Sequence, residues 1–328
     1  MLRIASYNFK AIAEGSLSLI PGTTAIFNRG TQGTNSARYC YSVWLRHLVR
    51  SSAYRKRLFD GLVVELGPGD SLGIGLAALL SGARWYTAID VVHHANVERN
   101  LAVLAELVRL FTARTPIPDD QEFPLVNPQL ADYAFPHHLL DSDWMVANLA
   151  PARVNAIAAA LRDQAEGLPM VRYVSPDATH ELQTGSACLV FSQAVLEHVD
   201  DLSSVYAACH AWLEDGGMMS HQIDFKSHGT SRVWNGHWAY PTLVWKLIRG
   251  RRPYLLNREP CGTHLRLMET HGFEILEVER MRLPSPLRRD QLSSELQGMG
   301  CDDMTTSGAF VMARKRPDQN SNSRAPGS

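Results

Sequence analysis

Apolar residues along this chain alternate between short runs and longer amphipathic stretches. The short runs are the kind that form buried strands, because they are brief and bounded by turn residues: Leu62–Leu66, Trp85–Asp90, Val171–Val174, Ala187–Ser192 and Met218–Phe225. Stretches of helical character lie before, between and after them: Ser36–Lys56, Leu72–Leu80, Asn96–Arg114, Val154–Ala165, Leu202–Leu213 and Leu265–His271. Strands that alternate with helices in this way predict a doubly wound α/β sheet.

The end of the chain differs from this alternation. Phe273–Arg282 and Ala309–Arg314 predict a closing pair of strands, which we expect to form an antiparallel hairpin. Two stretches lack this pattern, at about 115–150 and 226–259. We expect them to be insertions that form lids over the domain. We therefore expect an N-terminal helical cap over residues 1–57, one domain over 58–316, and a disordered polar tail over 317–328.

Composition narrows the class of protein. The formal net charge is -1, so a nucleic-acid partner is not expected. The five cysteines contain no CxxC pair, and neither a signal peptide nor an apolar run long enough for a bilayer is present. These features indicate a cytoplasmic protein without a transmembrane segment. The histidines lack metal-ligand spacing, so no metal is expected.

The turn after the first predicted strand has the form of a nucleotide site. Gly67 and Gly69 allow a sharp turn and a close approach of the backbone to a ligand. Asp90, at the end of the next strand, is placed to accept the hydroxyls of a ribose. Glu65 and Asp70 flank the turn, and their charges favour a cationic ligand over a pyrophosphate.

Five segments in chain order resemble the motifs of class I S-adenosylmethionine-dependent methyltransferases. They are VELGPGD at 64–70, AID at 88–90, SPDA at 175–178, VFSQAVLEHV at 190–199 and LEDGG at 213–217. The resemblance covers about residues 58–314 and implies a Rossmann-like, seven-stranded sheet with S-adenosylmethionine as cofactor. The cofactor-binding residues that it implies are Glu65, Gly67, Gly69, Asp70, Asp90, Asp177, Ala178 and Ser192. One position departs from the family, since Cys188 stands where an aspartate is usual.

Two other functions remain open from the residues alone. Gly69–Gly73 reads GDSLG, which is also the GxSxG signature of a serine esterase that would use Ser71. Asp177 and His180 offer an acid and a base, but the GxND block of that esterase family is missing. A non-catalytic module that keeps a nucleotide pocket is the second alternative.

The acceptor of the methyl group is expected to be a small molecule, such as a sugar or a secondary metabolite, with a hydroxyl or an amine. For its general base we expect His221 first, then His198 and Asp224, because these residues lie at or near the ends of central strands. The second insertion is rich in Trp and Arg, and we expect it to cover the acceptor pocket.

Overall fold

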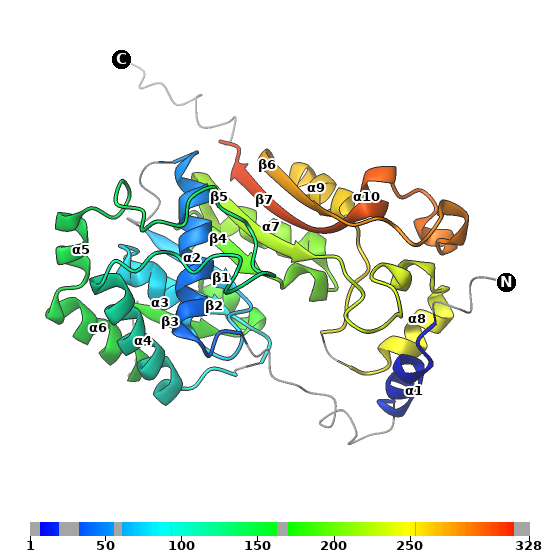
Figure 1. Cartoon of the computed structure of the whole chain (residues 1–328), viewed down its shortest axis with the longest axis horizontal. Helices are drawn as coiled ribbons and strands as arrows, with labels where there is room; N and C mark the ends of the chain where they lie inside the picture. The colour runs from blue at the N-terminus through cyan, green and yellow to red at the C-terminus, as the bar shows by residue number, and fades with distance from the viewer. Residues whose placement is uncertain are drawn as a thin grey trace, which may run out of the picture.

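The computed structural model describes residues 7–19, 33–55, 61–92, 94–162, 170–252 and 254–317. Within them the chain forms a central sheet with helices on both faces, and a smaller helical unit at one end (Figure 1). Most of the predicted tail, 318–328, lies outside the described residues. In the described part of the chain no helix is both long and apolar enough to cross a bilayer.

The sheet has seven strands in the order β3-β2-β1-β4-β5-β7-β6. The first five in this order pair in parallel, and β7 and β6 close the sheet as an antiparallel pair. This arrangement confirms the predicted fold class. The strands are β1 (Leu62–Leu66), β2 (Trp85–Ile89), β3 (Val171–Val174), β4 (Ala187–Gln193), β5 (Leu213–Asp224), β6 (Phe273–Arg282) and β7 (Thr306–Lys315).

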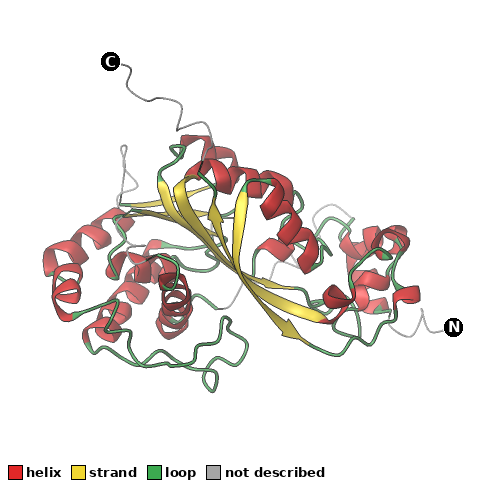
Figure 2. Cartoon of the chain, turned by 90° about the horizontal axis from the view of Figure 1, so that it is seen from above, coloured by secondary structure: helices red, strands yellow, loops and turns green. Residues whose placement is uncertain are grey.

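Helices cover both faces of the sheet (Figure 2). The side chains of β1 alternate, so that Val63 packs with one set of helices and Val64 with the other. The first face carries α2 (Ala37–Ser52), α3 (Gly73–Leu80), α4 (Val97–Thr112), α5 (Ser142–Asn148) and α6 (Pro151–Arg162). The second face carries α7 (Leu202–Trp212) and α9 (Cys261–Thr270). A short α10 (Cys301–Thr305) precedes β7.

The first insertion lies along α2, on the first face of the sheet. It is fixed by Arg46, which is fully buried and donates hydrogen bonds to the carbonyls of Pro118, Val126 and Pro128. One end of it reaches the carboxyl end of β4, where Gln193 donates to the Asn127 carbonyl. This insertion is therefore mainly a layer over α2, and it meets the strand ends only near Asn127.

The two described helices of the N-terminal region pack against different parts of the chain. Helix α2 begins where the pattern predicts it, after the N-cap Ser36, and packs on the sheet. An additional helix, α1 (Phe9–Leu17), packs instead against α8 (Thr242–Arg249) of the second insertion (Figure 1). Gly15 allows this contact, because a Cβ atom there would lie 2.1 Å from the carbonyl oxygens of Leu247 and Ile248. The second insertion thus has its own small core, shared with α1.

Candidate functional site

The turn after β1 has the backbone that a close ligand approach requires. Gly67 and Gly69 have φ angles of +62° and +74°, which strongly favour glycine. A Cβ atom on Gly67 would lie 2.6 Å from a methyl group of Val195, in the segment that follows β4. The turn and the post-β4 segment are therefore adjacent walls of one site at the carboxyl edge of the sheet.

The glycines of helix α3 serve packing. A Cβ atom on Gly73 would lie 2.5 Å from the sulfur of Cys40 in α2, and one on Gly75 would overlap the ring of Tyr86. Both residues therefore allow α3 to lie tightly between α2 and β2.

The N–H groups at the start of α3 already have partners within the protein. The N–H of Ser71 donates to the Thr34 hydroxyl, that of Leu72 to the Asn100 side chain, and that of Gly73 to the Ser71 hydroxyl. A pyrophosphate at a helix N-terminus needs such groups free. Their occupation disfavours a dinucleotide and fits a cofactor that carries no phosphate.

Glu65 occupies a different place from the one its motif suggests. Its carboxyl is buried and accepts a hydrogen bond from the hydroxyl of Tyr86. Burial raises the pKa of Glu65 to about 8, against the lowering effect of the Tyr86 and Gly75 hydrogen bonds. Glu65 is therefore neutral at pH 7, and the expected attraction for a cation must come from Asp70 and Asp90 instead.

Asp90 lies at the end of β2, where the sequence places the ribose acid. Its carboxylate accepts from the Val92 N–H at 3.3 Å. Burial raises the pKa of Asp90, while the hydrogen bonds from the backbone of Val92 and Gly69 oppose that change. The contact with Gly69 joins the acid directly to the turn.

Asp70 is also buried, and Asn35 donates to its carboxylate at 3.3 Å. Residues just before α2 therefore cover this side of the turn, which the motif alone does not reveal.

The remaining residues of the predicted cofactor set lie after β3 and within β4. Asp177 and Ala178 are in a short 3-10 helix after β3, where Asp177 is exposed. Ser192 is in β4 beside Leu66 of β1 and is fully buried. Its hydroxyl bonds the Nδ1 atom of His221 at 2.8 Å. Ser192 thus supports the strand end from within the sheet.

His221 is enclosed completely and lies between Ser192 of β4 and Val311 of β7. Burial lowers the pKa of His221 to about 3, with a further lowering from His47 and His264. Because this ring is enclosed and weakly basic, it is not placed to take a proton from an acceptor, which disfavours His221 as the general base.

A polar cluster lies at the carboxyl ends of β4 and β5. Asp224 ends β5, and its carboxylate bonds Nε2 of His228 at 3.3 Å and Nζ of Lys226 at 3.3 Å. The rings of His228 and His198 lie 5.2 Å apart. Burial would raise the pKa of Asp224, but the His228 bond and the Lys226 charge lower it overall, so Asp224 is ionised.

His198 and Asp224, both singled out from the sequence, therefore lie at the same edge of the sheet. His228 lies between them, bonded to Asp224 and beside the His198 ring. His228 was missed because it lies past the strand in an insertion, although its spacing of four residues from Asp224 is visible in the sequence. Burial lowers the pKa of His198 to about 4, so its ring is neutral at pH 7. Within the described ranges no group of His, Cys, Asp and Glu is arranged to hold a metal ion.

The predicted esterase arrangement is not formed. Ser71 is fully buried, and its hydroxyl donates to the Thr34 carbonyl. His180 bonds the carbonyl of Asp177 in its own turn. Ser71 of the GxSxG signature is therefore a packed residue and is not placed to act as a nucleophile.

The aromatic and basic residues of the second insertion mostly build its own core. Trp238 is fully buried and donates to the Arg258 carbonyl at 3.0 Å. Arg258 lies over the ring of Trp245, and Arg252 pairs with Glu14 of α1. These side chains hold the insertion together, so they are poor choices for contacts with an acceptor.

The departure at Cys188 is remote from this site. Cys188 lies at the start of β4 and donates to the Leu62 carbonyl at 3.3 Å, at the opposite edge of the sheet. The site at the carboxyl edge is thus unaffected by it.

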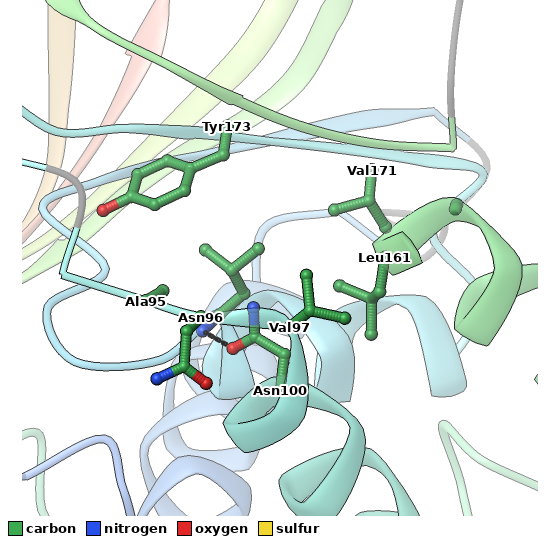
Figure 3. Close-up of a pocket in the computed structure, with 9 residues that line it drawn as sticks. Ala95, Asn96, Val97, Asn100, Leu161, Val171 and Tyr173 are labelled. Carbon is green, nitrogen blue, oxygen red and sulfur yellow. Dashed lines mark hydrogen bonds between the residues drawn. The ribbon is translucent and has the colours of Figure 1, made fainter. Parts of the chain in front are cut away.

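A cavity of about 210 Å³ lies between the start of α4, α6 and β3 (Figure 3). Its lining is mainly apolar, and the Asn100 side chain beside it is already bonded to Leu72. The volume is below the range of small-molecule pockets, roughly 300–1,000 Å³. None of the predicted cofactor residues lines it, so it is not the cofactor site.

Comparison with known protein families gives one match. A family model described as a methyltransferase domain matches residues 135–220, from the first insertion through β3 and β4 into β5. No curated protein sequence matches the chain.

Several solved structures are similar to it at low identity. An S-adenosylmethionine-dependent methyltransferase from Mesorhizobium loti shares 14% identity over 82% of this chain and 98% of that chain, with a TM-score of 0.41. One from Methanosarcina mazei shares 13% over 79% and 94%, with a TM-score of 0.41. A phosphoethanolamine N-methyltransferase from Haemonchus contortus shares 13% over 91% and 61%, with a TM-score of 0.43. These TM-scores are low, so the structures show only a distant likeness. The likeness to methyltransferases depends on the family model and the strand order.

Proposed function

We propose that this chain, a class I S-adenosylmethionine-dependent methyltransferase by its family match and strand order, methylates a small molecule at a hydroxyl or an amine. The observation that carries the proposal is the pair Asp224 and His228, which lies with His198 at the end of β5. This is the edge where the turn of Gly67 and the segment after β4 meet. Ligands of open α/β sheets bind at that edge.

The residues present fit the cofactor. Gly67 and Gly69 let the backbone approach it, Asp90 would hold the ribose hydroxyls, and Asp177 would meet the adenine amino group. When bound, S-adenosylmethionine supplies an activated methyl group on a sulfonium. The protein then has to align the acceptor, exclude water and accept a proton.

His228 is the member of the cluster with access to an acceptor. Its side chain is about one-third exposed at 32%, whereas that of Asp224 is exposed by 23%. The Asp224 carboxylate bonds Nε2 of His228 and would hold its ring in one orientation. We therefore assign His228 as the base and Asp224 as the residue that orients it, with His198 beside them.

The test is an assay of S-adenosylhomocysteine release with a panel of hydroxyl and amine acceptors. With an accepted substrate, His228→Asn should lower kcat at least about a hundredfold, the lower end of the range for general-base catalysis. His138→Asn, on an exposed histidine of the first insertion, is the matched control and should keep full activity. Full activity of His228→Asn would contradict the assignment. Binding of S-adenosylhomocysteine with no turnover of any acceptor would favour the alternative, a non-catalytic nucleotide-binding module.

A further inference from the structure

A small helical unit lies at one end of the molecule (Figure 1). We call it the α1–α8 unit and define it as residues 7–19, 240–252 and 254–256. Its inner faces are buried in a core of their own, to which Ala11, Tyr240 and Ile248 belong. The Arg251 N–H donates to the Ser18 hydroxyl at 2.9 Å, and this bond joins the chain after α8 to the end of α1. The two helices are therefore held together, and their outer faces form one small surface.

Exposed apolar side chains are concentrated on this unit. Twelve large apolar side chains are exposed in the described part of the chain, and six of these belong to the α1–α8 unit, although it holds only about a tenth of the described residues. The six are Phe9, Leu17, Leu19, Leu243, Leu247 and Tyr254. Single exposed apolar residues are ordinary, but a group of them marks a surface that contacts a partner or a membrane.

On α8 the exposed apolar residues share one face. Leu243 and Leu247 are four residues apart, a spacing that places both on the same side of a helix. Trp245 and Ile248 occupy the opposite side and are buried. Leu243 is 72% exposed, and Lys246 is exposed beside it. Helix α8 therefore has one apolar face packed in the protein and a second apolar stripe at the surface.

Helix α1 repeats this arrangement. Ala11 and Gly15 lie on its buried side, and Gly15 is the residue that touches the backbone of α8. Phe9 and Leu17 lie on the other side, where their side chains are 59% and 52% exposed. The unit thus presents exposed apolar side chains from both of its helices.

The charge of this unit is strongly positive. It has five basic residues and one acidic residue, whereas the formal net charge of the whole chain is -1. The basic residues are Lys10, Lys246, Arg249, Arg251 and Arg252. Arg249 and Arg252 are in ion pairs. Lys246 and Arg251 are exposed, and within the described ranges neither of them forms an ion pair.

Anionic lipid headgroups complement a surface of this kind. Exposed leucines beside unpaired cations are typical of helices that lie in a membrane interface, where the leucines enter the boundary with the acyl chains and the cations meet lipid phosphates. A second copy of the chain is a poorer partner. A two-fold contact through this surface would place the positive charges of two units against each other.

We propose that the α1–α8 unit docks on a membrane surface that carries anionic lipids. Leu243 and Leu247 enter the lipid boundary, and Lys246 and Arg251 contact the headgroups. This inference goes beyond the transfer of a methyl group, because none of these residues belongs to the cluster around His228.

The docked unit is joined to the candidate site by the residues that follow it. The side-chain amide of Asn257 donates hydrogen bonds of 2.8 Å to the carbonyls of Leu196 and Val199, in the segment after β4. This segment also carries His198. Docking would therefore hold this edge of the sheet close to the lipid surface.

Sedimentation with lipid vesicles tests the proposal on the full chain. The original chain should bind vesicles of phosphatidylglycerol and phosphatidylcholine in equal parts, and should bind vesicles of phosphatidylcholine alone more weakly. Raising the salt from about 0.1 M to about 1 M should weaken the binding, because it shortens the screening length from about 10 Å to about 3 Å. No binding of the original chain to the anionic vesicles would overturn the proposal.

Substitutions locate the surface that binds. Leu243→Glu should weaken vesicle binding at least about tenfold, because it removes an apolar contact and adds a negative charge. Lys246→Ala should weaken it about fivefold, the scale for one cation near an anionic surface. Leu125→Glu is the matched control, because Leu125 is 83% exposed on the first insertion, and it should bind as the original chain does. Both leucine variants should keep the melting temperature of the original chain.

Two results would contradict the docking surface. The first is equal binding of Leu243→Glu and the original chain to the anionic vesicles. The second is an oligomer of the original chain that Leu243→Glu separates in analytical ultracentrifugation while vesicle binding is unchanged. In that case the surface is a contact between copies of the chain, and the proposal fails.

Discussion

The buried carboxyl of Glu65 makes the stability of this protein depend on pH in a defined direction. Glu65 is enclosed at 2% exposure, and its nearest partners are the Tyr86 hydroxyl and the Gly75 N–H. Glu65→Gln replaces a group that can ionise with one of the same shape that cannot. The folded chain should tolerate this change near pH 6, because the carboxyl is neutral there.

The expected magnitude follows from the pKa. Burial raises the pKa of Glu65 from 4.5 to about 8 in the folded chain. Between these two values the folded state binds one more proton than the unfolded state, so the free energy of unfolding falls as pH rises. At about 1.4 kcal/mol per pKa unit, the loss for this one carboxyl is roughly 3–5 kcal/mol by pH 9.

The assay is urea unfolding of the original chain and Glu65→Gln at intervals from pH 5 to pH 9. The variant should gain stability relative to the original chain as pH rises, and other titrating groups cancel in the difference. Glu98→Gln, on an exposed glutamate of α4, is the control and should show no such gain. Equal pH dependence of the original chain and Glu65→Gln would refute the reasoning.

Two further perturbations follow from buried groups. Trp238→Ala should lower the free energy of unfolding by about 3–5 kcal/mol, because it leaves a large cavity in the core of the insertion. Chemical denaturation measures this loss, and a value under about 1 kcal/mol would contradict the packing described for Trp238. Burial lowers the pKa of His47 to about 4, and those of His221 and His264 to about 3. These rings are neutral in the folded chain but charge in the unfolded chain below about pH 6.5, so stability should fall as pH drops from there toward pH 4. In the Glu65→Gln variant, which lacks the opposite titration of Glu65, a melting temperature that is equal at pH 7 and pH 4.5 would count against this account.

The sequence predicted the first four strands well because they are short apolar runs between turns that only a few residues can form. Gly67 and Gly69 illustrate this, since their positive φ angles are a local requirement that the sequence carries directly. Helix α1 was not predicted, because its stability comes from Gly15 and α8, which lie more than 200 residues apart in the chain. Contacts of this kind leave no periodic signal.

The candidate site was predictable only in part for a related reason. The motifs located the strand ends, so His198, Asp224 and Asp90 lie where expected. Whether a side chain faces the ligand or the core depends on neighbours that are distant in sequence. Burial makes Glu65 a neutral group that bonds the Tyr86 hydroxyl, and Ser192 bonds His221 inside the sheet. Trp238 likewise belongs to the core of the insertion, which its composition alone could not distinguish from an acceptor contact.

The most direct test of the account is the choice between two cofactors. Calorimetry of the purified chain should show binding of S-adenosylhomocysteine and no binding of NAD, because the N–H groups at the start of α3 are already occupied. Asp90→Ala should weaken the binding of S-adenosylhomocysteine by about 1–3 kcal/mol, the scale for losing hydrogen bonds to a charged group. Binding of NAD, with S-adenosylhomocysteine ignored, would contradict the central claim.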